Sequence, residues 1–449
     1  MSTMTSTMFQ PELEAMDPKR LRALQGERLA ALISRLKASH SPYWAAKLAG
    51  LEPGSFGSIE DLQRLPLTIK AELRDNFPFG MLAVPLADTV RVHASSGTRG
   101  KPTVVAYTAA DIDLFAVLNA RAIVASGGRR EDVLHIAYGY GLFTGGLGVH
   151  FGGERLGATV VPASGGNPGL QVQLMADLGA DGLACTPSFA LLLAERAEAD
   201  GLKERIQKKL RYGVFGAEPW SEAFRSKLEQ AWEGLEAHDI YGLTEVMGPG
   251  VAAECRESRG SLHIFDDHFY PEVLDERGEP VPPGMPGELV LTTLTKEALP
   301  VIRYRTGDVT SFVAGPCACG RTSRRIARLS GRVDDMLVIR GINVYPSEIE
   351  AVLLDDRRVS GHYQIILDRR DALLELVVRA ELAAPVGPDE RAELLQSLAA
   401  GLKERLRLRV GVLVGEPGEL LRQETGKAKR VWEVTSADDP LAALIDTAS

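Results

Sequence analysis

The chain has 449 residues, with 51 Lys and Arg against 60 Asp and Glu, a formal net charge of −9 and a hydrophobic fraction of 45%. This length allows two or three domains with large cores and excludes a small disulfide-stapled scaffold. Charges of both signs are interspersed, which argues against a nucleic-acid or anionic-membrane binder, so we expect small-molecule partners.

The sequence also bears on the location of the protein. No stretch approaches the roughly 18–20 continuous apolar residues of a membrane span. Met1–Pro11 has neither the basic nor the apolar region of a secretory signal. We therefore expect a cytoplasmic protein. In that reducing compartment its four cysteines are more readily metal ligands or core thiols than disulfides.

The front of the chain is predicted to be α/β. The period of Leu21–Leu36 indicates an amphipathic helix within a helical cap over about the first 80 residues, broken by a turn at Pro53–Gly57. From Val90 onward, short β-rich runs alternate with helical patterns, which is typical of crossover units and a parallel sheet. The runs are Val104–Tyr107, Val133–Ala137, Ala158–Pro162, Gly182–Thr186 and Leu210–Gly213.

The later part of the chain shows a different pattern of expected strands and helices. Glu272–Leu274 and Glu288–Leu294 are short strands between Gly/Pro turns, which indicates antiparallel or barrel-like structure. After Gly331 a compact alternation predicts a separate α+β domain of roughly 115 residues. Its expected strands are Met336–Ile339, Tyr363–Asp368, Leu373–Ala380 and Val410–Val414, and its expected helices are Ser347–Leu354 and Asp389–Leu406.

One segment, Ser95–Thr103, combines small hydroxyl residues, two glycines and Lys101. Backbone N–H groups, hydroxyls and an ammonium in such a loop can surround phosphate oxygens. The segment does not match the Walker pattern, and Pro102 follows the lysine. By itself it leaves phosphate binding and a plain hairpin tip as equal alternatives.

Further motifs follow in order along the chain: Tyr241–Glu245, Tyr304–Asp308 at the end of a strand, Gly331–Asp335 and Thr425–Ala428. From about Val90 to Val431 the chain resembles the adenylate-forming superfamily of acyl-CoA synthetases, adenylation domains and luciferases. Within it, four segments are similar to the phenylacetate-CoA ligase family: Tyr138–Gly148, Glu245–Gly250, Leu294–Pro300 and Arg340–Pro346.

The resemblance implies a large multi-sheet α/β domain, residues 1–333, and a small mobile α+β domain, residues 334–449. It also implies a two-step reaction. A carboxylate and ATP give an acyl-adenylate and pyrophosphate, and the thiol of coenzyme A then displaces AMP. The implied partners are ATP, Mg²⁺, coenzyme A and an aryl carboxylate, since a flat ring suits the glycine-rich segment before Gly148 better than an alkyl chain.

The resemblance also implies site residues. For ATP and AMP they are Ser95, Ser96, Gly97, Thr98, Gly100, Gly216, Ala217, Glu218, Asp239, Tyr241, Gly242, Thr244, Asp308 and Arg332. For catalysis they are Lys101, Glu245 and Lys427, with Glu245 a hard ligand for Mg²⁺. Asp308 would accept both ribose hydroxyls. The alternative readings are a helix-start carboxylate for Glu245, a turn residue for Asp308 and a solvated cation for Lys427.

Other implied roles concern the acyl group, the acceptor and the domain motion. Tyr138, Tyr140, Phe143 and Pro249 would line an apolar acyl pocket, with core packing as the equal alternative for each aromatic residue. Gly139–Gly148 is expected to be a shaped loop rather than a regular element. Asp334 would be the hinge between the domains, and Gly341 and Asn343 would line the coenzyme A tunnel.

Three of the four cysteines fall in a pattern that one branch of the family uses for structural zinc. Cys317 and Cys319 form the knuckle, and Cys255 with His263 would complete a closed Cys₃His site, with His268 as the alternative imidazole. The competing reading is a pair of ordinary reduced thiols. Cys185, in an apolar strand end, is expected to be a core residue.

Two other functions stay open. One is a stand-alone adenylating enzyme that passes a substituted benzoate to a carrier-protein thiol. The other is a nucleotide-binding regulator without catalysis, which the presence of Lys101, Glu245, Asp308 and Lys427 disfavours. The ring substituents of the substrate and the oligomeric state, for which a homodimer is one option, are not determined by these patterns.

Overall fold

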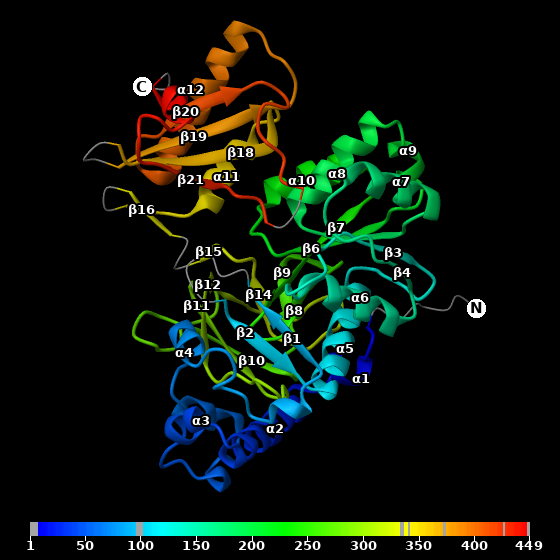
Figure 1. Ribbon diagram of the computed structural model, residues 1–449, viewed down its shortest axis with the longest axis vertical. Coiled ribbons are helices and arrows are strands. Elements are labelled where there is room, and N and C mark those ends of the chain that lie inside the picture. The colour runs from blue at the N-terminus through cyan, green and yellow to red at the C-terminus, as the bar shows by residue number, and fades with distance from the viewer. Residues whose placement is uncertain are drawn as a thin grey trace. The chain divides into compact units, whose positions relative to one another are not determined.

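The computed structural model (Figure 1) describes residues 8–95, 102–332, 336–339, 342–370, 374–424 and 427–446, and for Asn343 the backbone alone. Its contacts divide the chain into two compact units. The large unit comprises Met1–Cys185, Glu204–Ala217 and Gly234–Arg328, and the small unit comprises Thr186–Lys203, Glu218–Glu233 and Leu329–Ser449. Two stretches that precede residue 333 therefore group with the C-terminal part of the chain.

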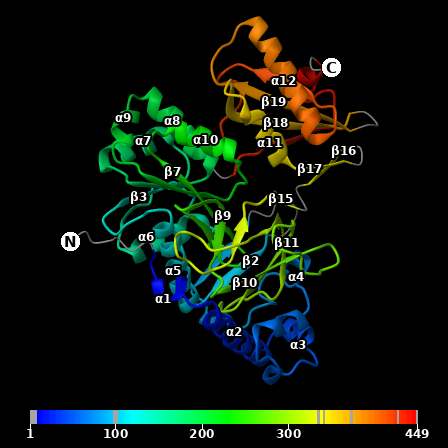
Figure 2. The ribbon, with the colours of Figure 1, turned by 180° about the vertical axis from the view of Figure 1, so that it is seen from behind.

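The first part of the large unit is helical. Its helices are α1 (Pro11–Glu14), α2 (Pro18–Ala38), α3 (Pro42–Lys47) and α4 (Lys70–Asp75), joined by 3₁₀ turns at Pro53–Ser55 and Ile59–Arg64, with a further turn at Leu86–Asp88. Figure 2 shows α2 and α3 together at one end of this unit. The Asp17 carboxylate accepts hydrogen bonds from the backbone N–H groups of Lys19 and Arg20 and so caps α2. The helix predicted over Leu21–Leu36 is confirmed.

A nine-stranded sheet in the order β13-β14-β9-β8-β7-β6-β5-β3-β4 forms the centre of the large unit. The parallel half consists of β3 (Val133–Ile136), β4 (Thr159–Val161), β5 (Gly182–Cys185), β6 (Tyr212–Gly216) and β7 (Glu236–Leu243). The antiparallel half consists of β8 (Gly248–Cys255), β9 (Ser258–Ile264), β13 (Phe312–Val313) and β14 (Arg325–Ala327). The predicted parallel sheet is thus present, extended by hairpins.

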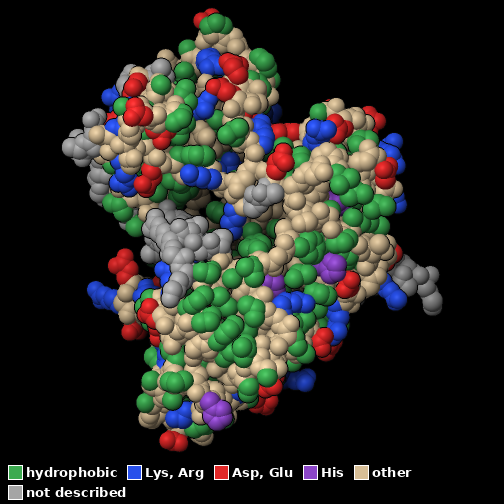
Figure 3. Space-filling model, in the orientation of Figure 1, with side chains coloured by type: hydrophobic (Ala, Val, Ile, Leu, Met, Phe, Trp, Pro, Cys, Tyr) green, Lys and Arg blue, Asp and Glu red, His purple; other side chains and the backbone are tan. Residues whose placement is uncertain are grey.

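Two smaller antiparallel arrangements complete the large unit. β1 (Arg91–Ala94) pairs with β2 (Val104–Tyr107), and β10 (Phe269–Leu274), β11 (Gly287–Thr293) and β12 (Tyr304–Thr310) follow one another in a second sheet. The antiparallel structure predicted for Glu272–Leu274 and Glu288–Leu294 is confirmed. Figure 3 shows hydrophobic side chains on the face that carries β1 and β2, and Val90 and Val92 are among the exposed ones.

Two helices pack unusually closely beside the sheet, α5 (Ala109–Ala125) and α6 (Gly145–Leu156). A Cβ atom on Gly152 of α6 would lie 2.4 Å from the Cβ of Asn119, and one on Gly148 would lie 2.4 Å from the Phe115 ring. Glycine therefore permits the close approach. The expectation of a loop over Gly139–Gly148 was wrong for its second half, because these glycines serve helix packing. In chain order, α7 (Pro168–Leu178) lies between β4 and β5, and α9 (Lys203–Gln207) lies just before β6.

The small unit contains a four-stranded sheet in the order β20-β19-β18-β21. Its strands are β18 (Val359–Asp368), β19 (Glu375–Leu382), β20 (Gly411–Gly415) and β21 (Val431–Val434), and its helices are α8 (Pro187–Ala199), α10 (Glu222–Ala231), α11 (Pro346–Asp355), α12 (Pro388–Leu406) and α13 (Ala442–Ile445). Short strands β15 (Gly331–Arg332), β16 (Leu337–Ile339) and β17 (Ile342–Val344) precede them. The predicted α+β alternation after Gly331 is confirmed.

Across the described part of the chain, no helix combines the length and the apolar composition needed to cross a bilayer.

Candidate active site and metal cluster

A tight turn after β7 carries Thr244 and Glu245. A Cβ atom on Gly242 would lie 1.7 Å from the carbonyl oxygen of Gly248, so only glycine allows the end of β7 to meet the start of β8. The N–H groups of Val246 and Met247 donate to the carbonyl of Leu243 and close the turn. The close approach of these two backbones therefore requires a glycine at position 242 of the Tyr241–Glu245 motif.

Glu245 is buried, with 4% of its surface exposed, and it does not occupy a solvated helix start. The Tyr304 hydroxyl, on β12, donates a 2.7 Å hydrogen bond to Glu245 Oε1. This bond orients one carboxylate oxygen and ties the turn to a second sheet. A buried carboxylate held in this way is suited to an oxygen-seeking divalent cation.

Asp308 follows Tyr304 on the same strand, on the same side of the pleat, and is also buried. The Tyr241 hydroxyl donates a 2.6 Å hydrogen bond to Asp308 Oδ2. β12 shifts register against β11 around this point, and Gly307 has φ +77, so Asp308 sits in an irregular part of the strand. The motif thus lies inside β12, whereas the sequence pattern predicted a strand end.

The carboxyl ends of β6 and β7 lie side by side, since Gly216 pairs with Ile240. A Cβ atom on Gly216 would lie 2.3 Å from the Ile240 carbonyl oxygen, and Ala217 adopts φ +69, a conformation rare for a side-chain-bearing residue. Strained backbone of this kind collects at ligand sites. Ligands of open α/β sheets bind at such carboxyl ends, so Gly216, Ala217 and Tyr241 meet where the fold favours binding.

Asp239 lies on β7, two residues before Tyr241. Its backbone N–H donates to Glu254 Oε2 at 2.7 Å, and its carboxylate faces Arg328 at 3.8 Å. Arg328 in turn reaches Glu254 Oε1 at 3.4 Å. Asp239 is therefore part of an ion network in the sheet, a role that the motif alone does not reveal.

Several candidate residues lie outside the described residues: Ser96, Gly97, Thr98, Gly100, Lys101, Asp334 and Gly341. Ser95 and Thr103, at the two ends of the Ser95–Thr103 segment, are described and are joined by two bonds, from Ser95 N–H to the Thr103 carbonyl at 2.9 Å and from Thr103 N–H to Ser95 Oγ at 3.1 Å. Ser95 directly follows β1 and Thr103 directly precedes β2, and the two strands are paired. Arg332 lies on β15, in the small unit.

The acyl-pocket candidates lie at the start and along the side of α6. A Cβ atom on Gly145 would meet the Phe143 ring at 2.7 Å and the Tyr138 ring at 3.5 Å, so both rings lie against the first turn of the helix. One turn on, a Cβ atom on Gly148 would lie 2.9 Å from the Pro249 side chain. Tyr140 differs, because its hydroxyl bonds His150 Nδ1 at 3.2 Å; burial, with a smaller contribution from Glu154, raises the pKa of Tyr140 to about 12.

Lys427 is described and exposed, and it belongs to the small unit. The next residue, Ala428, donates its backbone N–H to Glu218 Oε1 at 2.5 Å. Glu218 belongs to the same unit. The structure therefore brings Glu218 to the residue that follows Lys427, whereas the motif resemblance assigns Glu218 to the nucleotide.

A buried lysine of the Leu294–Pro300 segment lies near the carboxylates of the large unit. Lys296 has no exposed surface, and its Nζ has no hydrogen-bond partner among the described residues. The Nζ lies 4.7 Å from the centroid of the Tyr107 ring. Burial lowers the pKa of Lys296 to about 8, partly offset by the charges of Asp111 and Glu245. No periodic pattern distinguishes such a lysine from an exposed one, so the sequence did not mark it.

Cys255, His263, Cys317 and Cys319 form one cluster, with one ligand atom from each and all four within 4.8 Å of one another. Cys255 Sγ lies 3.6 Å from Cys317 Sγ and 3.6 Å from His263 Nε2, and Cys319 Sγ lies 3.4 Å from His263 Nε2. Zn–S bonds of about 2.3 Å in a tetrahedron separate sulfurs by roughly 3.8 Å, so the donor set fits zinc.

The surroundings support the same donor set. His263 Nδ1 lies 3.1 Å from Ser323 Oγ, which leaves Nε2 for an ion. The alternative imidazole, His268, is instead bonded to Thr295 and faces Asp267 at 3.1 Å, so it does not belong to the cluster. Cys185, on β5, is fully buried and outside it.

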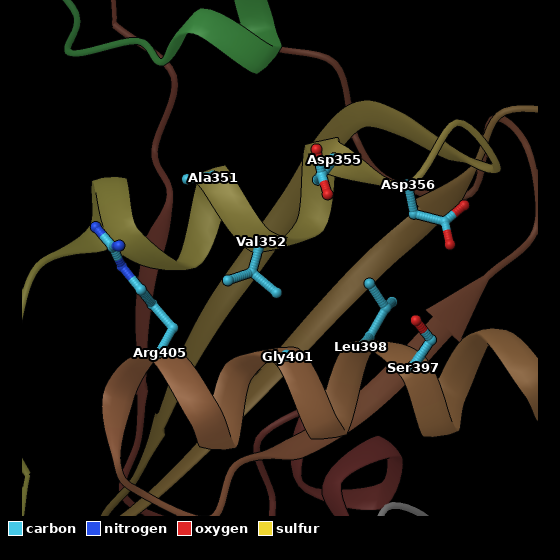
Figure 4. Close-up of a pocket in the computed structure, with 8 residues that line it drawn as sticks. All are labelled: Ala351, Val352, Asp355, Asp356, Ser397, Leu398, Gly401 and Arg405. Atoms are coloured by element: carbon cyan, nitrogen blue, oxygen red, sulfur yellow. The ribbon is translucent and has the colours of Figure 1, made fainter.

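A shallow pocket of about 400 Å³ lies between α11 and α12 (Figure 4). Val352 and Leu398 point into it, with Asp355, Asp356 and Arg405 at its rim. None of the candidate site residues lines it. The pocket therefore belongs neither to the Glu245 turn nor to the cysteine cluster.

Two family models match the chain. Residues 62–294 match that of AMP-binding enzymes, and residues 341–434 match that of the C-terminal domain of AMP-binding enzymes. A solved structure of 2-hydroxyisobutyryl-CoA ligase with its acyl-adenylate, in the postadenylation state, is 28% identical with a TM-score of 0.90, covering 100% of this chain and 96% of that one. The protein is therefore an adenylate-forming acid–thiol ligase by class.

Curated relatives narrow the class. The phenylacetate-coenzyme A ligase of Thermus thermophilus is 46% identical over 95% of this chain and 99% of its own length. That of Aromatoleum evansii is 47% identical over 93% of this chain and 96% of its own. The chain belongs to the phenylacetate-coenzyme A ligase family.

Proposed function

We propose that the protein activates phenylacetate, or a closely similar aryl carboxylate, with ATP and transfers the acyl group to coenzyme A. The observation that carries this proposal is the pair of buried carboxylates, Glu245 and Asp308, each held by a tyrosine hydroxyl in one unit. Full-length identity of 46% to a phenylacetate-coenzyme A ligase supports the choice of acid and acceptor.

Each carboxylate has a distinct proposed task. Glu245 holds Mg²⁺ on the phosphates of ATP, since a hard cation prefers carboxylate oxygens. Asp308 accepts the two ribose hydroxyls, and the bond from Tyr241 fixes how its carboxylate is turned. Gly216 and Ala217 allow the adenine to approach the backbone at the end of β6, with the Tyr241 ring beside it. Thr244 and Arg332 belong to the nucleotide side by resemblance.

Lys427 supplies positive charge to the carboxylate and α-phosphate as charge redistributes in the first half-reaction. Lys101, with Ser95, Ser96, Gly97, Thr98 and Gly100, contributes to the phosphate site. The test is pyrophosphate exchange into ATP in the presence of phenylacetate. Lys427→Ala should reduce exchange by at least about 100-fold, in the range of one lost electrostatic contact of a transition state. Exchange at the wild-type rate would refute the assignment.

The acyl group and the acceptor can be tested together. Phenylacetate, benzoates and indole-acetate are assayed for AMP release, with and without coenzyme A. Strong release with phenylacetate that requires coenzyme A supports the proposal. Turnover restricted to a substituted benzoate, and indifferent to coenzyme A, would instead support a stand-alone adenylating enzyme that serves a carrier-protein thiol.

The proposal includes a domain division at residues 333 and 334, with Asp334 as hinge. It also includes the roles of Gly341 and Asn343 in the coenzyme A tunnel. A cytoplasmic location and a homodimeric state stay predictions from the sequence.

We further propose a structural zinc ion held by Cys255, His263, Cys317 and Cys319. Three thiolates and one imidazole fill a tetrahedral site and leave no position for water, so such an ion would stabilise the fold and not react. The supporting observation is the geometry of the four ligand atoms.

A further inference from the structure

We propose that Glu218 is a positioning residue for Lys427: it holds the backbone at Ala428, next to Lys427, for the first half-reaction and is dispensable in the second. This inference rests on the proposed role of Lys427. It differs from an adenine-framing role for Glu218, because the contacts of its carboxylate are made to protein groups of the small unit.

The Glu218 carboxylate is the meeting point of two segments. Its Oε1 accepts the Ala428 backbone N–H at 2.5 Å and the Ser188 hydroxyl at 2.9 Å, and its Oε2 faces the Ser188 backbone N–H at 3.3 Å. Ser188 lies in the first turn of α8, where free N–H groups and the helix dipole favour a negative charge. The carboxylate therefore has a fixed site, from which it holds the residue next to Lys427.

A second set of contacts, here called the second anchor, holds Arg422, on the other side of Lys427. Arg422 donates to both carboxylate oxygens of Glu381, at 2.7 and 2.9 Å, and its Nε donates to Glu195 Oε2 at 3.2 Å. Glu195 is also bonded to His362 through Oε1 at 2.8 Å. Bidentate arginine–carboxylate pairs are strong and directional. Arg422 is therefore fixed in both position and orientation.

The charge of the second anchor is itself stabilised. Burial raises the pKa of Glu195, but bonds and charge from His362 and Arg422 outweigh it and lower the pKa overall. In Glu381 the effect of burial on the pKa is likewise outweighed by Arg422 and by the Leu420 N–H. Both carboxylates are therefore ionised and paired at neutral pH.

Helix α8 takes part in both anchors, through Ser188 and Glu195. Arg422 and Ala428, on either side of Lys427, are thus held in part by Glu195 and Glu218, which lie 227 and 210 residues earlier in the chain. Lys427 is exposed, and the position of its backbone limits where its ammonium group can reach. Glu218 is the nearer of the two anchors.

The test separates the two half-reactions. Adenylation is measured as pyrophosphate exchange into ATP with phenylacetate, and thioester formation is measured from prepared phenylacetyl-adenylate and coenzyme A. Glu218→Ala should lower the kcat of adenylation about 10- to 100-fold, the range for a lost hydrogen bond to a charged group, with KM for ATP within about threefold. Thioester formation should stay within about twofold.

Three further variants control the interpretation. Glu218→Gln keeps an oxygen that can accept the Ala428 N–H, so it should retain most of the adenylation rate. Glu198→Ala removes an exposed carboxylate of α8 that pairs with Lys203 and belongs to neither anchor, and it should change neither half-reaction. Ser188→Ala should lower adenylation in the same sense as Glu218→Ala but less.

Three results would overturn the inference. Equal loss in both half-reactions would mean a general structural role. A rise in KM for ATP without a fall in kcat would mean adenine binding. Unchanged adenylation in Glu218→Ala, with exchange lost in Lys427→Ala, would mean that the lysine needs no such anchor. If Lys427→Ala itself retained exchange, the proposed function of Lys427 would fail, which is a separate outcome.

Discussion

The hydroxyl of Tyr241 donates a 2.6 Å hydrogen bond to Asp308 Oδ2 and so connects β7 of the nine-stranded sheet with β12 of a different sheet. Both residues are buried, with 8% and 2% of their surfaces exposed. The bond therefore sets the direction in which the carboxylate is turned. That direction depends on a residue 67 positions away in the chain.

Tyr241→Phe keeps the ring and removes this donor. A hydrogen bond to a charged group contributes about 1.5–3 kcal/mol, so KM for ATP should rise roughly 10- to 100-fold in pyrophosphate exchange. Tyr270→Phe, a tyrosine of β10 on the same unit, is the matched control and should leave KM unchanged. An unchanged KM in Tyr241→Phe would show that the bond does not orient Asp308 for ATP.

Tyr304→Phe should weaken the use of Mg²⁺. Without the 2.7 Å bond from Tyr304, the Glu245 carboxylate is no longer held toward one direction. The Mg²⁺ concentration for half-maximal adenylation should rise about tenfold, consistent with one lost charged hydrogen bond. Glu245→Gln should lower the rate at every Mg²⁺ concentration. If Tyr304→Phe changed the ATP dependence and not the Mg²⁺ dependence, Glu245 would not be the metal ligand.

Lys296 predicts a pH dependence of stability. Burial lowers its pKa from 10.5 to about 8, so between these pH values the unfolded chain binds a proton that the folded chain has released. Stability from this group is therefore lowest below pH 8 and rises toward pH 10.5. A pKa difference of this size corresponds to about 3 kcal/mol.

Lys296→Met removes the titrating group and keeps most of the side-chain volume. Denaturant unfolding of wild type and variant at about pH 7 and about pH 10 provides the measurement, and the comparison cancels the groups common to both. The stability of the wild type relative to the variant should increase by up to about 3 kcal/mol at the higher pH. If the difference in unfolding free energy between wild type and variant were the same at both pH values, the lowered pKa of Lys296 would be contradicted.

The cysteine cluster predicts metal content. Protein purified without added zinc should contain about one equivalent, Cys317→Ser should lose most of it, and Cys185→Ala should retain it. Arg321 links the cluster to α1, since its backbone N–H donates to Cys319 Sγ and its side chain pairs with buried Glu14 at 2.8 Å. Metal loss should therefore also expose α1 to protease. Retention of the metal in Cys317→Ser would refute the ligand set.

Much of the local structure was predictable. Leu21–Leu36 and Val104–Tyr107 form a helix and a strand, because their apolar period and β-rich composition match the burial found there. Gly145, Gly146 and Gly148 of α6 were misassigned to a loop, since the sequence carries no sign of the helix that packs against them. His263 could not be separated from His268 by spacing, because both fall within reach of the same knuckle.

The sequence by itself determined the family, the order of the motifs and the residue types that carry the chemistry, because those depend on local backbone needs such as Gly242 against Gly248. Only the tertiary structure decided which other residues contact these site residues. Tyr304 meets Glu245 across 59 residues, and Ala428 meets Glu218 across 210. The burial of Lys296 is likewise a property of the packed sheets. Such contacts join segments whose meeting depends on the whole fold, and no local pattern encodes them.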